Sequence, residues 1–293
     1  MMVSGRAVAT ALCALGTTSA FTGPLAAGSF RASKAVGRQV GRNAGRNLQM
    51  ATVAEAYDLK VKGEENTMDY RAFFNQGGKE ISPWHDIPLK AGADTFNYVC
   101  EIPKYSLAKM EIATKEPNNP IAQDMKKGKL RFYHGPIFWN YGYIPQTWED
   151  PTVKHPEASQ LGVLGDGDPV DVVEIGSAKL ASGAVKAIKP LGCLAMIDDG
   201  ELDWKVIGID VDDPLAKDLN DIADVEKLLP GYVSGIREWF RWYKTPDDKP
   251  LNEFGFGEKA LGKDETMKII DECNGHWKAL IDGKTEAGKM WIK

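Results

Sequence analysis

Five short apolar segments between residues 96 and 210 set the strongest limit on the fold of this chain. Each is six or seven residues long and is bounded by Pro, Gly or Asp, and no helical pattern lies between neighbouring segments. A parallel α/β sheet needs a helix between successive strands, so this pattern favours a small barrel or sandwich. The predicted strands are 96–102, 108–113, 170–175, 191–197 and 204–210.

The last third of the chain predicts helices. Helical patterns cover 215–229, 234–243 and 264–281, and in the second of these Ile236, Trp239, Phe240 and Tyr243 recur at helical spacing. We expect the three helices to cover the barrel from outside. No repeat or linker divides the chain after residue 55, so residues 51–293 are predicted to form one domain.

The first 50 residues are typical of a targeting presequence. An apolar stretch at 7–16 follows Arg6 and precedes small residues at 17–20, which predicts a signal peptide over about 1–20. Residues 21–50 are basic, rich in Ala, Gly and Ser, and free of acids, as in a transit peptide. The junction Ser-Ala-Phe resembles the bipartite presequence of algal plastids bounded by extra membranes. We expect import into the plastid stroma; a single transit peptide and the mitochondrion are the alternatives.

Charge and apolar content exclude several functional classes. The first 54 residues hold six of the 36 basic residues and no acid, which leaves 30 basic residues against all 41 acidic ones in the remainder. The region after residue 54 is therefore acidic, and its negative charge does not favour nucleic-acid binding. No apolar run approaches the length of a membrane-spanning helix, so no membrane association of the mature protein is expected. The four cysteines fit neither a zinc finger nor a disulfide framework and predict buried thiols.

The sharpest local signal is Gly-Asp-Gly-Asp-Pro-Val-Asp at 165–171, which places Asp166, Asp168 and Asp171 within six residues. Like charges this close repel one another, so a bound divalent cation would stabilise them. A solvated acidic turn explains the segment equally well.

A second segment extends the acidic pattern. Around a turn at 198–203, Asp203 and Lys205 alternate with apolar residues along the following strand, and Lys109 and Glu111 do the same elsewhere. Such faces are ordinarily exposed to solvent. They can also line a polar interior, where acids and lysines suit metal ions that bridge a phosphorylated ligand.

The acidic segments allow three alternative interpretations besides a site for a phosphorylated ligand. Calcium binding of the EF-hand type fails, because its sixth position is Asp171 instead of Gly and its twelfth is Ser177 instead of Glu. A haloacid-dehalogenase-like phosphatase with its nucleophile at Asp166 would need an alternating β/α sheet. A non-catalytic binder of pyrophosphate or cations is a third possibility.

Seven segments of the chain together carry a family resemblance. They are 83–89 (PWHDIPL), 101–112 (EIPKYSLAKMEI), 119–132 (NPIAQDMKKGKLRF), 140–151 (NYGYIPQTWEDP), 165–176 (GDGDPVDVVEIG), 198–210 (DDGELDWKVIGID) and 238–250 (EWFRWYKTPDDKP). In this order they resemble the soluble family I inorganic pyrophosphatases of the eukaryotic type, whose signature Asp-x-Asp-Pro-x-Asp is intact at 166–171.

The resemblance implies a mainly β, α+β fold, with a distorted five-stranded OB-like barrel and flanking helices. It implies Mg²⁺-dependent hydrolysis of pyrophosphate to two orthophosphates, and a homodimer. It also implies several Mg²⁺ ions per site, with Asp166, Asp171, Asp198 and Asp203 as metal ligands and Glu101 and Glu111 ordering water on the metals. The implied substrate-binding residues are Lys109, Arg131, Tyr141, Lys205, Tyr243 and Lys244.

The residues also suggest how the reaction proceeds. We hypothesise that Asp168 is the general base that accepts a proton from the attacking water, and that Lys205 and Arg131 stabilise charge on the phosphoryl oxygens. One departure from the family pattern stands out, because a further tyrosine implied by the resemblance is Ile137 here. We expect this departure to alter affinity and to leave the chemistry intact.

Overall fold

A computed structural model describes residues 57–154 and 162–293, all of which belong to one compact unit. The predicted presequence, 1–50, lies outside the described residues. Within the described ranges, no helix is both long and apolar enough to cross a membrane.

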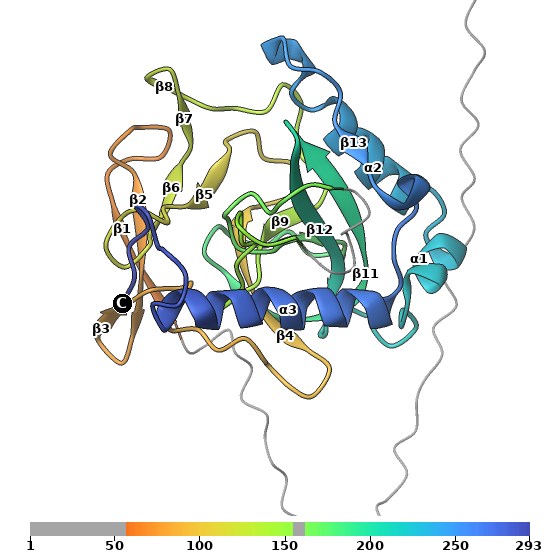
Figure 1. The fold of residues 1–293 in the computed structure, drawn as a ribbon, viewed down its shortest axis with the longest axis horizontal. Helices are drawn as coiled ribbons and strands as arrows, with labels where there is room; N and C mark the ends of the chain where they lie inside the picture. Colours follow the sequence, from red (N-terminus) through yellow and green to blue (C-terminus); the bar gives the residue numbers. More distant parts are fainter. Residues whose placement is uncertain (1–56, 155–161) are drawn as a thin grey trace, which may run out of the picture. The chain divides into compact units, whose positions relative to one another are not determined.

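Two sheets and a hairpin contain the strands of the described residues (Figure 1). The first sheet consists of β1 (Asp58–Lys62), β2 (Arg71–Gln76), β3 (Lys79–Ile81), β5 (Met110–Ile112) and β6 (Ile121–Gln123). The hairpin consists of β7 (Met125–Lys126) and β8 (Lys129–Leu130). The other sheet consists of β4 (Phe96–Ile102), β9 (Asn140–Tyr143), β10 (Asp171–Glu174), β11 (Val185–Asp198), β12 (Glu201–Asp210) and β13 (Glu253–Phe254).

Five strands of the larger sheet close on themselves. Their order is β12-β10-β9-β4-β11, and β11 also pairs with β12, so the ring has no free edge among these five strands. All the pairs are antiparallel except β10 with β12, which is parallel. The expected mainly β fold is confirmed in this coarse form.

The composition of the ring differs from the prediction in one strand. The segment 108–113 does contain β5, but β5 pairs with β6 in the smaller sheet, where Met110 lies opposite Gln123. Its place in the ring is taken by β9, whose sequence Asn-Tyr-Gly-Tyr carries no strand-like apolar run. Strand β9 fits there because Gly142 lies against β4, where a Cβ atom would come within 1.9 Å of the Val99 carbonyl oxygen.

Three helices accompany the sheets: α1 (Ile222–Leu228), α2 (Tyr232–Trp242) and α3 (Lys263–Ile281). The predicted start of the first helix at residue 215 is wrong by seven residues. The helix begins later because Asp221 caps it by accepting a hydrogen bond from the Ala223 N–H, while the Asp224 carboxylate bonds the backbone N–H of Asp221. Short 3₁₀ turns follow at η3 (Thr245–Asp247) and η4 (Phe256–Glu258).

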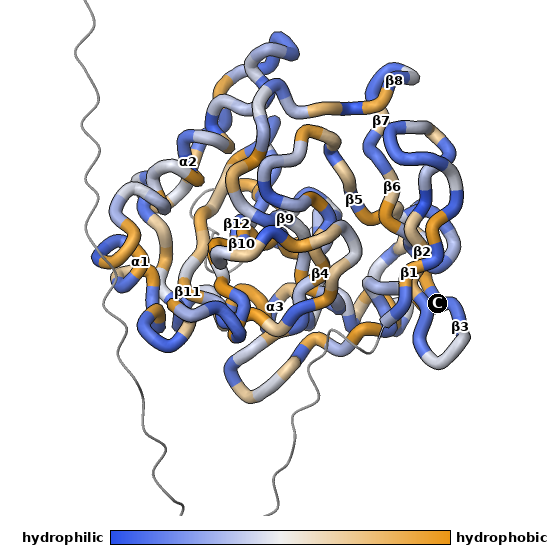
Figure 2. The backbone as a smooth tube through the Cα atoms, turned by 180° about the vertical axis from the view of Figure 1, so that it is seen from behind, coloured by the Kyte–Doolittle hydropathy of each residue, from blue (hydrophilic) through white to orange (hydrophobic). Residues whose placement is uncertain are grey.

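The helices pack on different parts of the ring. Ile236 and Phe240 of α2 are buried in a cluster with residues of β9, β10, β11 and β12. Ile269 and Ile270 of α3 are buried in a second cluster, with residues of β4, β10, β11 and β12. Figure 2 shows hydrophobic residues along parts of β4 and α3 and hydrophilic residues in many of the outer loops. Cys100, Cys193 and Cys273 are buried and form no disulfide, as predicted.

Candidate active site

A cavity of about 430 Å³ collects most of the side chains that the sequence predicted for the site. They come from β9, β10, β11 and β12, from the loop before β10, from the end of α2, and from the positions just before β5 and just after β8. The predicted residues that line it are Lys109, Arg131, Tyr141, Asp166, Asp168, Asp171, Asp198, Asp203, Lys205, Tyr243 and Lys244. Glu101 and Glu111 do not line it. The Glu101 carboxylate accepts a hydrogen bond from the Ile112 N–H at 2.6 Å, and Glu111 lies 2.5 Å from the Lys109 ammonium.

Strand register brings opposite charges together at the centre of the cavity. In the parallel pair β10–β12, Asp171 lies opposite Lys205. The Lys205 side chain is 2% exposed, its Nζ is 2.5 Å from Asp171 Oδ2, and it also contacts Asp203. The Tyr141 hydroxyl donates to the same Asp171 oxygen at 2.5 Å. The charged face of β12 therefore lines a polar interior. Of the two possibilities that the sequence left open for this face, exposure to solvent is the wrong one.

The loop that carries Asp166 and Asp168 is fixed by its own backbone and by a neighbouring loop. Gly167 has φ +88°, a conformation that favours glycine, and the Asp168 N–H donates to Asp166 Oδ1 at 2.9 Å. The Glu149 N–H donates to the Asp168 carbonyl and the Gly167 N–H to the Glu149 carbonyl, both at 2.9 Å. The Trp148 indole N–H donates to the Gly167 carbonyl at 2.8 Å.

Burial and mutual repulsion act on the acids of this cavity. Loss of hydration and the nearby charges of Glu111 and Asp171 raise the pKa of Asp168 to about 6, although its side chain reaches solvent in the cavity. Burial also raises the pKa of Asp203 to about 7, against the opposing effect of Lys205. Burial and the charge of Asp203 hold the pKa of Asp166 well above its ordinary value. Bound cations would offset the negative charges and the lost hydration that raise these pKa values.

One group of acids has the geometry of a metal site. Oxygen atoms of Glu149, Asp166 and Asp203 all lie within 4.8 Å of one another. Carboxylate oxygens are the ligands that Mg²⁺ prefers, and a cation among these acids would offset the burial and mutual repulsion that Lys205 offsets only in part. The donor set therefore fits Mg²⁺. The sequence argument named Asp166 and Asp203 but not Glu149.

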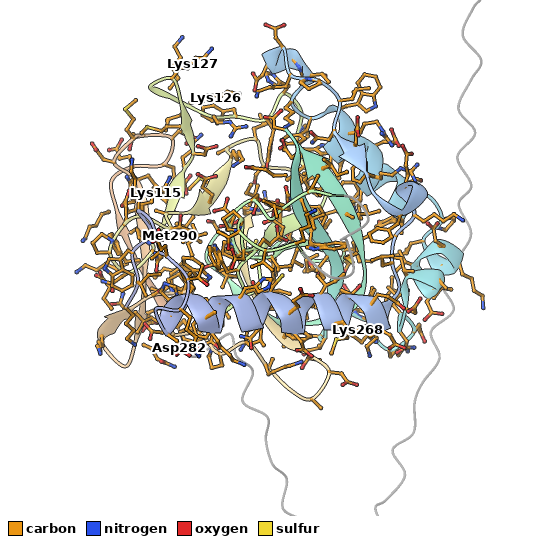
Figure 3. The ribbon with its side chains drawn as sticks, in the orientation of Figure 1. Lys115, Lys126, Lys127, Lys268, Asp282 and Met290 are labelled. Carbon is orange, nitrogen blue, oxygen red and sulfur yellow. The ribbon has the colours of Figure 1, made fainter. Side chains whose placement is uncertain are left out.

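A second set of side chains lines the cavity from the end of α2. The Lys244 ammonium contacts Asp198, and the Tyr243 hydroxyl donates to the same carboxylate at 3.1 Å. Burial, with the positive charges of Lys249, Arg131 and Lys126, lowers the pKa of Lys244 to about 8. Lys126 reaches the rim from the hairpin β7–β8; Figure 3 shows it with Lys127 on this hairpin.

Two residues next to the predicted cations were missed. Asp124 contacts Arg131 and lies 3.1 Å from Lys109 Nζ, so it separates two like charges. Tyr133 lines the cavity beside Tyr243. Asp124 and Glu149 lie in two of the segments that carry the family resemblance, which was the signal that could have identified them.

Other features of the fold exclude a competing reading. No helix separates β9 from β10 among the described residues, and the loop of Asp166 precedes β10 inside a closed ring. A haloacid-dehalogenase-like nucleophile requires alternating strands and helices, so that alternative is wrong.

A larger cavity, of about 550 Å³, lies at Tyr70, Ser106 and Lys179, and Glu65 is the one acid that lines it within the described ranges.

Comparisons with known proteins give a consistent result. Residues 98–278 match the family described as inorganic pyrophosphatase. The chain is 55% identical over 228 residues to the chloroplastic soluble inorganic pyrophosphatase 1 of Chlamydomonas reinhardtii, with 78% of this chain and 80% of that protein covered. It is 54% identical over 230 residues to the chloroplastic soluble inorganic pyrophosphatase 6 of Arabidopsis thaliana, covering 78% and 76%. The crystal structure of the type I inorganic pyrophosphatase of Toxoplasma gondii superposes with a TM-score of 0.73 at 48% identity, covering 76% of this chain and 99% of that one.

Proposed function

The chain belongs to the inorganic pyrophosphatase family and is an inorganic diphosphatase, and from this premise we propose a Mg²⁺-dependent attack of water, in line on phosphorus, with Asp168 as the general base. One observation carries the proposal. The cavity joins a group of carboxylates that fits cations to a set of lysine, arginine and tyrosine side chains that fits phosphate oxygens.

We assign the acids as follows. Asp166, Asp171 and Asp203 hold one Mg²⁺, Asp171 also contributes to a second, and Asp198 and Asp203 meet the ions that arrive with substrate. When bound, Mg²⁺ makes water more acidic and offsets the negative charge of the substrate. Glu149 supports this group from the neighbouring loop, because its Oε1 accepts a hydrogen bond from the Trp204 N–H at 3.0 Å and its oxygens lie near Asp166 and Asp203.

Asp168 has the position and the basicity of a general base. Its side chain reaches solvent in the cavity, and its backbone is held by hydrogen bonds to Asp166 and Glu149. With its pKa raised to about 6, the carboxylate is mostly ionised at neutral pH, yet it binds a proton more readily than an ordinary aspartate. The proton lost by the attacking water moves to this carboxylate.

The cationic side chains bind the substrate. We assign Lys205 and Arg131 to charge stabilisation on the phosphoryl oxygens, and Lys109, Tyr243 and Lys244 to substrate binding. Tyr141 also lines the cavity and donates to Asp171, which orients that ligand. Asp124 lies between Lys109 and Arg131 and pairs with both, which offsets the repulsion between these two positive charges.

Location and assembly are further proposals. We propose that residues 1–50 direct the protein to the plastid stroma and that residues 51–293 form the catalytic domain. The two relatives from Chlamydomonas reinhardtii and Arabidopsis thaliana are named as chloroplastic, which supports this location. A fusion of residues 1–50 to a fluorescent protein tests this location. Fluorescence confined to plastids is expected, and fluorescence in mitochondria contradicts the proposal.

We also propose a homodimer, on the basis of the family resemblance. The molar mass in solution tests this proposal.

The decisive experiment is phosphate release by residues 51–293 with increasing Mg²⁺, in parallel assays on pyrophosphate, ATP and p-nitrophenyl phosphate. The proposal predicts Mg²⁺-dependent, pyrophosphate-selective release. Release without added divalent cation in the presence of a chelator contradicts the role of Mg²⁺. Preference for p-nitrophenyl phosphate contradicts the assigned chemistry.

A further inference from the structure

Three tyrosines line the active-site cavity, and two of their hydroxyls have partners. Tyr141 donates to Asp171 and Tyr243 donates to Asp198. The hydroxyl of Tyr133 has no hydrogen-bond partner within residues 57–154 and 162–293, although the residue is only 7% exposed. A buried phenol usually has a partner, so the position of this oxygen needs an explanation.

The Tyr133 oxygen is not enclosed in the core, and the positive charges that act on it come from Lys109 and Lys205 of the active-site cavity. The buried side-chain oxygens without a partner include the hydroxyls of Tyr98 and Tyr143, but not that of Tyr133. The Tyr133 hydroxyl therefore has solvent-accessible surface, and Tyr133 lines the cavity that holds the predicted phosphate-binding side chains. Its hydrogen-bonding capacity is available to a ligand there.

The ring of Tyr133 is held firmly in place. It packs edge-on against Trp239, with ring centroids 4.9 Å apart, and against Tyr243 at 5.9 Å. Its backbone N–H donates to the Leu107 carbonyl at 2.7 Å. A donor fixed in this way loses little conformational entropy when a ligand binds.

The charges around the phenol suit an anionic acceptor. The positive charges of Lys109 and Lys205 act on it, but burial outweighs them and raises its pKa, so the phenol keeps its proton at neutral pH. It can therefore donate to the oxygen of an anion. Phosphate oxygens are acceptors and carry the charge that the same lysines attract.

The position at which the family resemblance implies a tyrosine cannot supply this contact. Ile137 is fully buried in the core cluster that also contains Ile236 and Phe240, and it does not line the cavity. Tyr133 lies four residues earlier in the chain. We propose that Tyr133 is a substrate-binding residue whose phenol donates a hydrogen bond to a phosphate oxygen of pyrophosphate, in place of the tyrosine that the family pattern has at residue 137. This inference rests on the proposed function.

The test removes one oxygen and keeps the ring. In Tyr133→Phe we expect the dissociation constant of methylenediphosphonate, a non-hydrolysable analogue, to rise at least about fivefold in calorimetric titrations with Mg²⁺. We expect kcat/KM for pyrophosphate to fall about tenfold or more, because a hydrogen bond to a charged group is lost. The matched control is Tyr98→Phe, which removes a buried phenol oxygen from a residue that does not line the cavity, and it should leave both values unchanged.

The outcomes separate the possible explanations. A dissociation constant for the analogue within about twofold of the wild-type value overturns the proposal, whatever happens to stability. A purely structural role predicts this result, because phenylalanine keeps the packing on Trp239; the thermal unfolding midpoint, measured in parallel, reports on that packing. If the unmodified protein releases no phosphate from pyrophosphate, the proposed function fails, and the analogue titration still decides the role of Tyr133.

Discussion

His85 and the C-terminal residues give a quantitative prediction of lost stability in acid. His85 is 6% exposed, and its ring stacks on Trp84 with centroids 4.4 Å apart. The Trp277 indole N–H donates to Nδ1 at 3.0 Å, so the imidazole proton is on Nε2, which donates to the Trp291 carbonyl at 3.2 Å. A second proton would have to bind Nδ1, where Trp277 is already a donor.

The size of the effect follows from the pKa of this imidazole. Burial lowers the pKa of His85 from 6.5 to about 4; the Trp291 carbonyl and the charge of Asp86 oppose the shift, and Lys293 adds to it. A difference of this size corresponds to about 3 kcal/mol in the free energy of unfolding. The pKa of His85 is lower in the folded protein than in the unfolded chain. Its contribution to the free energy of unfolding is therefore complete above about pH 6.5, decreases as the pH is lowered, and is lost below about pH 4.

The assay compares the protein with His85→Gln, which cannot titrate in this range. Urea unfolding of both chains from about pH 7 to about pH 4.5 gives the difference in their free energies of unfolding, from which acid effects common to both chains cancel. We expect this difference to change by about 2 to 3 kcal/mol in favour of the variant as the pH falls. A difference that stays constant with pH would refute the reasoning.

Three further substitutions test the site. Asp168→Asn should lower kcat about 10²- to 10⁴-fold while the Mg²⁺ concentration for half-activity stays nearly constant, and near-normal turnover would exclude Asp168 as the base. The control Asp282→Asn, at the end of α3 and outside the cavity (Figure 3), should leave turnover unchanged. Asp166→Asn should raise the Mg²⁺ concentration for half-activity, measured by titrating initial rates; an unchanged value would exclude Asp166 as a ligand. Trp148→Phe should cost about 1 to 3 kcal/mol in urea unfolding and lower kcat, because the Gly167 carbonyl loses its indole donor; unaltered stability and kcat would show that this hydrogen bond does not position the loop.

Local sequence patterns identified several of the long elements, but the longest strand, β11, begins at Val185, six residues before the predicted start at 191. The strand at Phe96–Ile102 has the predicted bounds, and helices α2 and α3 begin and end within two residues of their predicted limits. Strand β1 was missed although Leu59 and Val61 alternate with polar residues, because a segment with only two apolar residues does not stand out from a polar loop; all five of its residues are exposed. Strands β6 to β9 have two to four residues each, so their pairing with distant strands decides their conformation.

Some residues of the site can be predicted from one short segment of sequence, whereas others depend on contacts between segments that are distant in the chain. Asp166, Asp168 and Asp171 could be found because their charges are crowded within one short segment. Glu149 could not be found in this way, because its approach to Asp166 depends on backbone hydrogen bonds between two loops 16 or more residues apart. The Tyr133 side chain reaches the cavity through packing on α2, which no local pattern encodes.

The central claim is that this cavity uses divalent cations held by its carboxylates to hydrolyse pyrophosphate. The most direct measurement is the initial rate of phosphate release from pyrophosphate by residues 51–293 as Mg²⁺ is added to chelator-treated protein. The account predicts no release before Mg²⁺ is added, a saturable rise with its concentration, and a shift of the curve to higher Mg²⁺ in Asp166→Asn. Equal rates with and without Mg²⁺, or identical curves for the two proteins, would contradict it.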